Sequence, residues 1–151
     1  MKTTEKTPKL DLSTTERAAL RSHHIRLNEL HDIDAQQLSA QLDISLQRAK
    51  ELKAMAAFQR IPSIGPQFAK DLMLLGYYRL EDVKGKDGAL LIEQLERLYG
   101  VQIDPCVEDQ FRLVVHYAEN PDSDKQWWDF TEERKQYRLQ HGYPEDRPSK
   151  A

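Results

Sequence analysis

The stretch from Ile61 to Lys70 is the part of the sequence whose residue types and spacing best fit a chemical task. Pro62 ends the helix before it and Pro66 suits the first turn of the next, so a tight turn around Ile64 should join two helices. The first N–H groups of a helix lack an intrahelical acceptor and carry the positive end of the helix dipole. Such a turn can bind a phosphate. The predicted contact residues are Ser63, Ile64, Gly65, Gln67 and Lys70.

A second turn, Lys84–Gly88, lies between a short predicted helix at 77–83 and a strongly apolar one at 89–99. Its two glycines and the second of its two lysines extend the predicted phosphate contacts to Gly85, Lys86 and Gly88. Each turn has a second interpretation. The first can be a structural plug in which Ile64 locks two helices, and the second an ordinary connection.

Three carboxylates near residue 106 have the residue types of a metal or acid/base site, but their positions favour structural roles. Asp104 precedes Pro105 as an N-cap, and Glu108 and Asp109 follow in the first turns of the helix. Cys106 and His116 are ten positions apart on this helix, about 15 Å along its axis, which is too far for a catalytic pair. The sequence therefore predicts no catalytic residue, no metal site and no cofactor, and the protein is expected not to be an enzyme.

The aromatic cluster Trp127-Trp128-Asp129-Phe130 allows two interpretations. Exposed rings would form a stacking platform for single-stranded bases. Buried rings would close the core of a short chain, and this interpretation is favoured because an exposed tryptophan pair lowers solubility. It predicts that Trp128 is largely buried.

Charge is unevenly distributed along the chain. The 151 residues include 22 basic and 25 acidic ones, but the segment 48–86 has eight basic and four acidic residues, so it carries +4 and the remainder −7. Nucleic-acid binding through so few charges should be weak and salt dependent. A single cysteine, no leading apolar segment and no apolar run of membrane-spanning length predict a cytoplasmic protein that does not contact membranes.

Helical periodicity and turn residues predict an all-α chain, with no strand alternation. The first helix is expected from about residue 14 to about residue 30, with Ser13, Asp34 and Ser45 capping successive helices. The predicted domains are a flexible N-terminus at 1–12, an N-terminal helical segment at 13–45, a domain at 46–140 that ends in C-terminal helices, and a flexible tail at 141–151.

The first turn with its flanking helices looks like a helix-hairpin-helix motif, and the second turn resembles a looser copy. From about Leu46 to Gln140 the chain resembles the bacterial pathogenicity-locus family of small helix-hairpin-helix proteins, and its middle region is similar to the C-terminal domain of competence-regulator proteins. The residues that carry the resemblance are Ile61–Gly65, Leu75–Tyr78, Lys84–Gly88, Asp104–Asp109 and Trp127–Phe130. The resemblance implies a tandem helix-hairpin-helix core with an N-terminal helical extension and a C-terminal capping helix.

The function expected from the sequence is non-catalytic, sequence-independent binding of nucleic acid, with DNA the expected form, through hairpin amides and nearby Lys and Arg. The alternative is a protein-interaction adaptor in which a degenerate hairpin serves only as scaffold, so a protein partner stays open beside a nucleic acid. Ser63 and Gln67, which replace the motif's usual glycine and basic residue, favour the adaptor.

Overall fold

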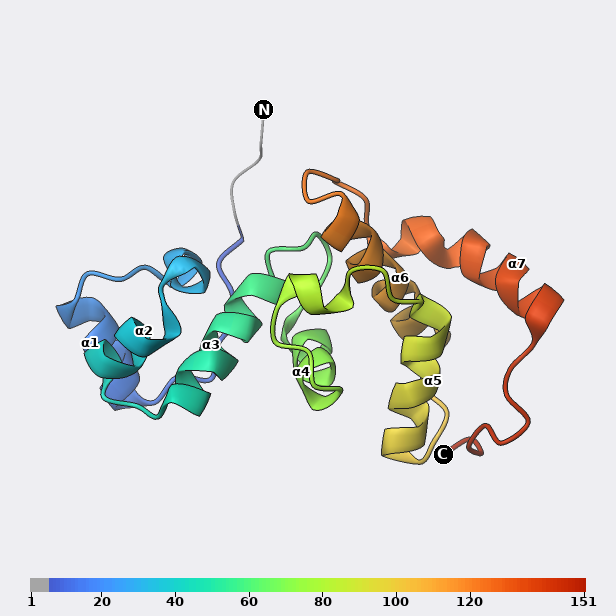
Figure 1. Ribbon diagram of the computed structural model, residues 1–151, viewed down its shortest axis with the longest axis horizontal. Helices are drawn as coiled ribbons and strands as arrows, with labels where there is room; N and C mark the ends of the chain where they lie inside the picture. The colour runs from blue at the N-terminus through green and yellow to red at the C-terminus, as the bar shows by residue number, and fades with distance from the viewer. Residues whose placement is uncertain (1–5) are drawn as a thin grey trace. The chain divides into compact units, whose positions relative to one another are not determined.

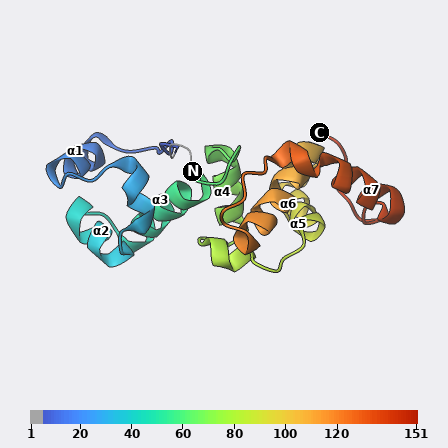
Figure 2. The same cartoon turned by 90° about the horizontal axis from the view of Figure 1, so that it is seen from above.

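The computed structural model describes residues 6–151, and the regular structure in this range is helical. No β-strand occurs among these residues, which confirms the predicted all-α class. The chain divides into two compact units, residues 1–79 (unit 1) and 80–151 (unit 2), coloured blue to green and green to red in Figures 1 and 2. None of the helices in the described range is long and apolar enough to cross a bilayer.

Unit 1 is built around one central helix. Its elements are α1 (Thr14–Ser22), the 3-10 helix η1 (Leu27–Asp32), α2 (Ala35–Leu42), α3 (Leu46–Phe58) and α4 (Pro66–Leu74). The predicted N-caps Ser13, Asp34 and Ser45 are present, each accepting a first-turn backbone N–H. α3 packs against η1, α2 and α4. Its buried side chains therefore form the middle of the apolar core of this unit.

The first helix is shorter than the sequence predicts. α1 ends at Ser22 because His24 adopts a left-handed conformation, with φ 58°. The Ile25 N–H then donates to the Leu20 carbonyl and the His24 N–H to the Arg21 carbonyl, the paired bonds of a Schellman ending. Histidine tolerates this conformation better than most residues, and a sequence pattern without glycine does not reveal it.

Unit 2 is built around α6 (Pro105–Glu119). Its other elements are the 3-10 helix η2 (Leu80–Val83), α5 (Gly88–Tyr99), the 3-10 helix η3 (Trp127–Phe130) and α7 (Thr131–His141). α6 packs against all four of them. Asp104 caps α6 as predicted, with its carboxylate accepting the Cys106 N–H at 2.8 Å.

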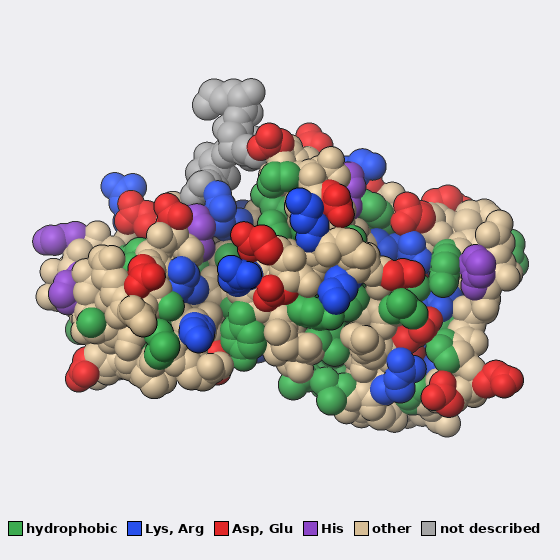
Figure 3. Space-filling view, viewed as in Figure 1, with side chains coloured by type: hydrophobic (Ala, Val, Ile, Leu, Met, Phe, Trp, Pro, Cys, Tyr) green, Lys and Arg blue, Asp and Glu red, His purple; other side chains and the backbone are tan. Residues whose placement is uncertain are grey.

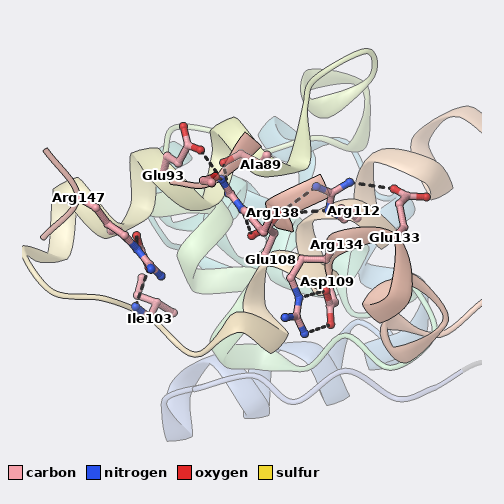
Figure 4. A network of polar contacts seen from close by, with 12 residues as sticks. Ala89, Glu93, Ile103, Glu108, Asp109, Arg112, Glu133, Arg134, Arg138 and Arg147 are labelled. Carbon is pink, nitrogen blue, oxygen red and sulfur yellow. Dashed lines mark hydrogen bonds and ion pairs between the residues drawn. The ribbon is translucent and has the colours of Figure 1, made fainter. Parts of the chain in front are cut away.

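Charge, not apolar burial, attaches α7 to this unit. None of its residues is buried, and Leu139 is 81% exposed. Arg134 pairs with Asp109 of α6 at 2.9 Å, and Arg138 pairs with Glu108 of α6 at 3.0 Å and with Glu93 of α5 at 2.8 Å (Figure 4). Two arginines thus connect three carboxylates on the helices beneath α7.

The segment after α7 returns to α5 through a further pair. Gly142 ends α7 with φ 65°, and Arg147 then forms two bonds with the Glu96 carboxylate at 2.9 and 3.0 Å. Two guanidinium groups lie over the ring of Tyr143, that of Arg138 4.2 Å and that of Arg147 3.6 Å from the ring centroid. These contacts, which the sequence did not predict, attach the last residues to unit 2.

Candidate functional site

The hairpin between α3 and α4 has the tight turn that the sequence predicts. The Ile64 N–H donates to the Ile61 carbonyl at 3.2 Å, and both side chains are buried. Ser63 occupies the left-handed region with φ 62°, where glycine is more usual. Gly65 then serves as the N-cap of α4, without a side-chain cap bond, and Pro66 takes the first helical position.

A lysine from the N-terminal segment binds this hairpin directly. The Lys6 ammonium donates to the carbonyl oxygens of Ile61 at 3.1 Å and Ile64 at 3.0 Å. Its partial burial lowers the pKa of Lys6. Both carbonyl oxygens point toward the ammonium group, and its positive charge stabilises their partial negative charges. A cation thus forms part of the hairpin itself, although it lies 55 residues away in sequence.

The backbone of Lys9 fixes the same segment to the end of α3. Its N–H donates to the Gln59 side-chain oxygen and its carbonyl accepts from the Gln59 side-chain nitrogen, both at 2.9 Å. The neighbouring Pro8 and Leu10 are buried. A pocket of about 280 Å³ lies beside these contacts. Its lining residues are Lys6, Thr7, Lys9, Gln59, Ser63, Ile64, Gly65 and Pro66.

Sequence reasoning missed Lys6 and Lys9, because residues 1–12 contain no helical periodicity and were predicted to be flexible. The only signal in this segment for a contact with the rest of the chain is that charged Lys6 and Lys9 alternate with apolar Pro8 and Leu10. Residues 1–5 of that prediction lie outside the described range.

The predicted polar positions on α4 have partners inside unit 1. Lys70 pairs with Asp11 at 3.1 Å, and Gln67 donates to the Asp71 carboxylate at 3.4 Å. Asp11 also accepts a bond from Arg48 through its backbone carbonyl, at 2.6 Å. The charge of Lys70 is thus shared with an exposed carboxylate, which weakens its field toward a phosphate.

The structure brings together five of the predicted contact residues, Ser63, Ile64, Gly65, Gln67 and Lys70, in unit 1 and places the other three in unit 2. Gly85 has φ 78° and is exposed with Lys86. Gly88 is buried at the start of α5, where an added Cβ would lie 2.7 Å from the Arg112 side chain. Its lack of a side chain therefore lets α5 approach α6 closely.

The carboxylates near residue 106 are structural in this fold. Glu108 and Asp109 are buried and paired with arginines. Burial raises the pKa of the Cys106 thiol, and the Asp104 carboxylate raises it further, which disfavours the thiolate form. Among residues 6–151 there is no group of His, Cys, Asp and Glu that could hold a metal ion.

The prediction that Trp128 is largely buried is wrong. Its side chain is 55% exposed, and Phe130 is the buried aromatic of the cluster at 6%. In a 3-10 helix residues three apart share a face, so Trp127 and Phe130 turn in the same direction and Trp128 turns away.

Comparisons with known proteins place the chain in a family. The family model described as pathogenicity locus matches residues 51–136, more than half of the chain. The chain belongs to this pathogenicity locus family, as its resemblance had indicated. The mitomycin resistance protein McrB of Streptomyces lavendulae is 29% identical over 85 residues, 56% of this chain and 78% of that protein. No solved structure gives a significant match.

Proposed function

We propose that this protein binds the sugar-phosphate backbone of nucleic acid, with DNA the expected form, without catalysis and without sequence preference. In this proposal α3, the turn 61–65 and α4 act as a helix-hairpin-helix, and the turn 84–88 with η2 and α5 acts as a second, looser copy. The similarity to the C-terminal domain of competence regulators belongs to the same proposal. The binding surface is the hairpin pocket of unit 1.

The position of Lys6 is the observation that carries the proposal. An ammonium group has three N–H donors, and two of them bind hairpin carbonyls. The third can reach a phosphate oxygen in the adjoining pocket, which Lys9 and the start of α4 also line. Lys6 thereby supplies a positive charge at the pocket, in place of the basic residue that the motif usually has at the position of Gln67.

Binding at this site should be weak and sensitive to salt. Lys6 and Lys9 are two charges, and Lys70 is already paired with Asp11. On the face seen in Figure 3, Lys and Arg side chains are interspersed with Asp and Glu. Since affinity for a polyanion comes mainly from counterion release, a site with few cations has low affinity, and that affinity falls further as salt rises.

A protein-interaction adaptor is the second candidate, and one observation favours it. The Ile64 side chain, in the turn between α3 and α4, is 0% exposed. A turn whose aliphatic residue is so well packed can have a purely structural role. In that case Lys6 would be a structural cation that satisfies two carbonyl oxygens.

Fluorescence anisotropy with a labelled random-sequence duplex and a labelled single strand separates the two candidates. The informative variant is Lys6→Ala with Lys9→Ala, and Lys50→Ala, an exposed lysine of α3, is the matched control. The double variant should weaken binding and reduce the salt slope by about 2, roughly one for each phosphate that a lysine no longer neutralises. The control should change neither.

The outcomes that contradict the proposal are distinct. Absence of binding at about 50 mM salt, where polyanion binding is strong, would leave the adaptor. Equal affinity and equal slope in the wild type and the double variant would show that nucleic acid does not bind at the hairpin. Circular dichroism of the double variant checks that weaker binding does not reflect unfolding.

A further inference from the structure

Trp128, an exposed aromatic residue of unit 2, has no role in the proposed phosphate site, which lies in unit 1. Trp128 leaves 55% of its surface exposed. Its ring meets Trp127 edge to face, with centroids 5.4 Å apart and planes at 82°. Exposing so much of an indole is unfavourable unless the ring contacts something else.

Contacts within and around η3 fix the orientation of this pair. Phe130 is buried beneath it and meets the His116 ring of α6 at 5.4 Å. The Asp129 carboxylate accepts the Gln126 N–H at 2.8 Å, and the Asp129 N–H donates to the Gln126 carbonyl at 3.0 Å. Trp128 is therefore presented by a short helix that is held at both ends, so little order has to be gained when a partner binds.

The charge around Trp128 is strongly negative. Within six residues on either side, the sequence has five acidic residues, Asp122, Asp124, Asp129, Glu132 and Glu133, and all five are exposed. The two basic residues in that window are Lys125 and Arg134. Arg134 is paired with buried Asp109, and the Lys125 ammonium lies 5.5 Å from the Phe130 ring. Glu133 is also paired, with Arg112 at 2.9 Å, so the negative charge near Trp128 in sequence comes from Asp122, Asp124, Asp129 and Glu132.

We propose that Trp128 and the surrounding carboxylates form a docking surface for an arginine-rich segment of a protein partner. A guanidinium stacks on the face of an indole and donates to carboxylates at the same time. Unit 2 already contains this type of stacking, with Arg147 3.6 Å and Arg138 4.2 Å from the Tyr143 ring centroid. The geometry is thus one that this part of the chain already forms within itself.

Charge decides against single-stranded nucleic acid as the occupant. Bases could stack on Trp128, but each would bring a phosphate toward the carboxylates of Asp122, Asp124, Asp129 and Glu132. The acidic surroundings attract a basic peptide and repel a polyanion. The docking surface is therefore independent of the hairpin pocket, and failure of one proposal leaves the other standing.

The test uses the full chain and a fluorescein-labelled hexa-arginine peptide in anisotropy titrations at low salt. Trp128→Ala should weaken binding about tenfold, within the range expected when a cation–π interaction is removed. Asp122→Asn with Asp124→Asn should weaken it severalfold and reduce its salt dependence. Leu139→Ala, which removes another exposed apolar side chain of unit 2, is the control and should leave affinity unchanged.

Two results would overturn the proposal. In the first, Trp128→Ala binds the peptide as tightly as the wild type does, which would leave only nonspecific attraction between opposite charges. In the second, Trp128→Ala loses affinity for labelled oligothymidine but keeps its affinity for hexa-arginine, which would identify the ring as a base-stacking surface. Because Trp128 is exposed, its removal should leave the fold intact, and the circular dichroism spectrum of the variant checks this.

Discussion

The two units attach their outer segments by different physical means. In unit 1 the segment 6–12 is held by the buried side chains of Pro8 and Leu10. The Lys6 ammonium also donates to two carbonyl oxygens, and the Gln59 side chain forms hydrogen bonds with the Lys9 backbone. In unit 2 α7 is held by ion pairs between its arginines and carboxylates of α5 and α6. The sequence matches this contrast, with 12 basic and 9 acidic residues in 1–79 (+3) and 10 basic and 16 acidic in 80–151 (−6). Unit 2 should therefore respond more strongly to the loss of one charge, and unit 1 to the loss of one apolar side chain.

Asp109→Ala should have the largest effect. Asp109 is 0% exposed and accepts bonds from both Arg134 and Thr131, so its removal leaves a guanidinium without a partner. Breaking a buried pair from one side costs about 3–5 kcal/mol of unfolding free energy. Urea denaturation measures the loss.

Replacing both partners tests whether charge or shape attaches α7. Asp109→Leu with Arg134→Met should recover much of the loss, because no charge is then left unpaired. A loss below about 1 kcal/mol for Asp109→Ala would mean that the pair is no stronger than an exposed one, and the contrast between the units would disappear.

Ile64→Ala should destabilise unit 1 by about 2–4 kcal/mol, the usual cost of a cavity at a fully buried aliphatic. The matched control is Leu74→Ala, since Leu74 is an apolar residue of α4 that is mostly exposed. Denaturation curves should show a shift for the first variant and almost none for the second. Similar small shifts in both would show that the hairpin aliphatic does not lock α3 to α4.

Lowering the pH should reduce the stability of both units, in each case by protonating a different carboxylate. Hydrogen bonds from Arg48 lower the pKa of Glu16 in unit 1 from its ordinary 4.5. Burial alone would raise the pKa of Glu96 in unit 2, but the bonds from Arg147 and the Ile103 N–H outweigh it, so this pKa is lowered as well. A lowered folded pKa gives stability that is fully present above the unfolded value and is lost as pH falls through the folded one.

Thermal melts between about pH 7 and about pH 3 measure this dependence. Glu16→Gln and Glu96→Gln should each flatten part of the acid-induced fall in midpoint, because each removes one of the two groups. If neither variant alters the slope, other carboxylates control the acid response.

Ser63→Gly should have the smallest effect, a stabilisation of at most about 1 kcal/mol. Serine at φ 62° is strained, whereas glycine adopts this conformation without penalty but loses more backbone entropy on folding. The variant also loses the bond from the Ser63 hydroxyl to the Pro62 carbonyl. A higher melting midpoint in the variant would show that Ser63 strains the backbone of the wild type. A lower one would show that the lost hydroxyl bond outweighs the relief of that strain.

The helices were predictable because short-range rules determine them. The caps at Ser13, Asp34, Ser45 and Asp104 each depend on residues two or three positions away, and all four are confirmed. The end of α1 was missed because His24 adopts the left-handed conformation without a glycine. Local sequence thus indicates where helices begin better than where they end.

The candidate site was predicted only in part, because half of it is assembled over long distances in sequence. The turn 61–66 could be recognised from two prolines and one glycine. The bond from Lys6 to Ile61 spans 55 residues, and the Gln59–Lys9 pair spans 50. No periodicity relates residues so far apart, so the cation of the pocket could be found only in the folded chain.

The arginines of unit 2 also affect where the chain can be cut. The stretch shared with the family runs from 51 to 136, so it begins inside α3 and ends before Arg138 and Arg147. A fragment with these borders would keep the carboxylates of Glu93 and Glu96 but discard the guanidiniums of Arg138 and Arg147 that pair with them, and Glu108 would keep only its pair with Arg112. The stretch that matches the family and the set of residues that hold unit 2 together therefore have different boundaries, and an expression fragment that is meant to fold should extend at least through Ser149, whose carbonyl accepts the Gln102 N–H.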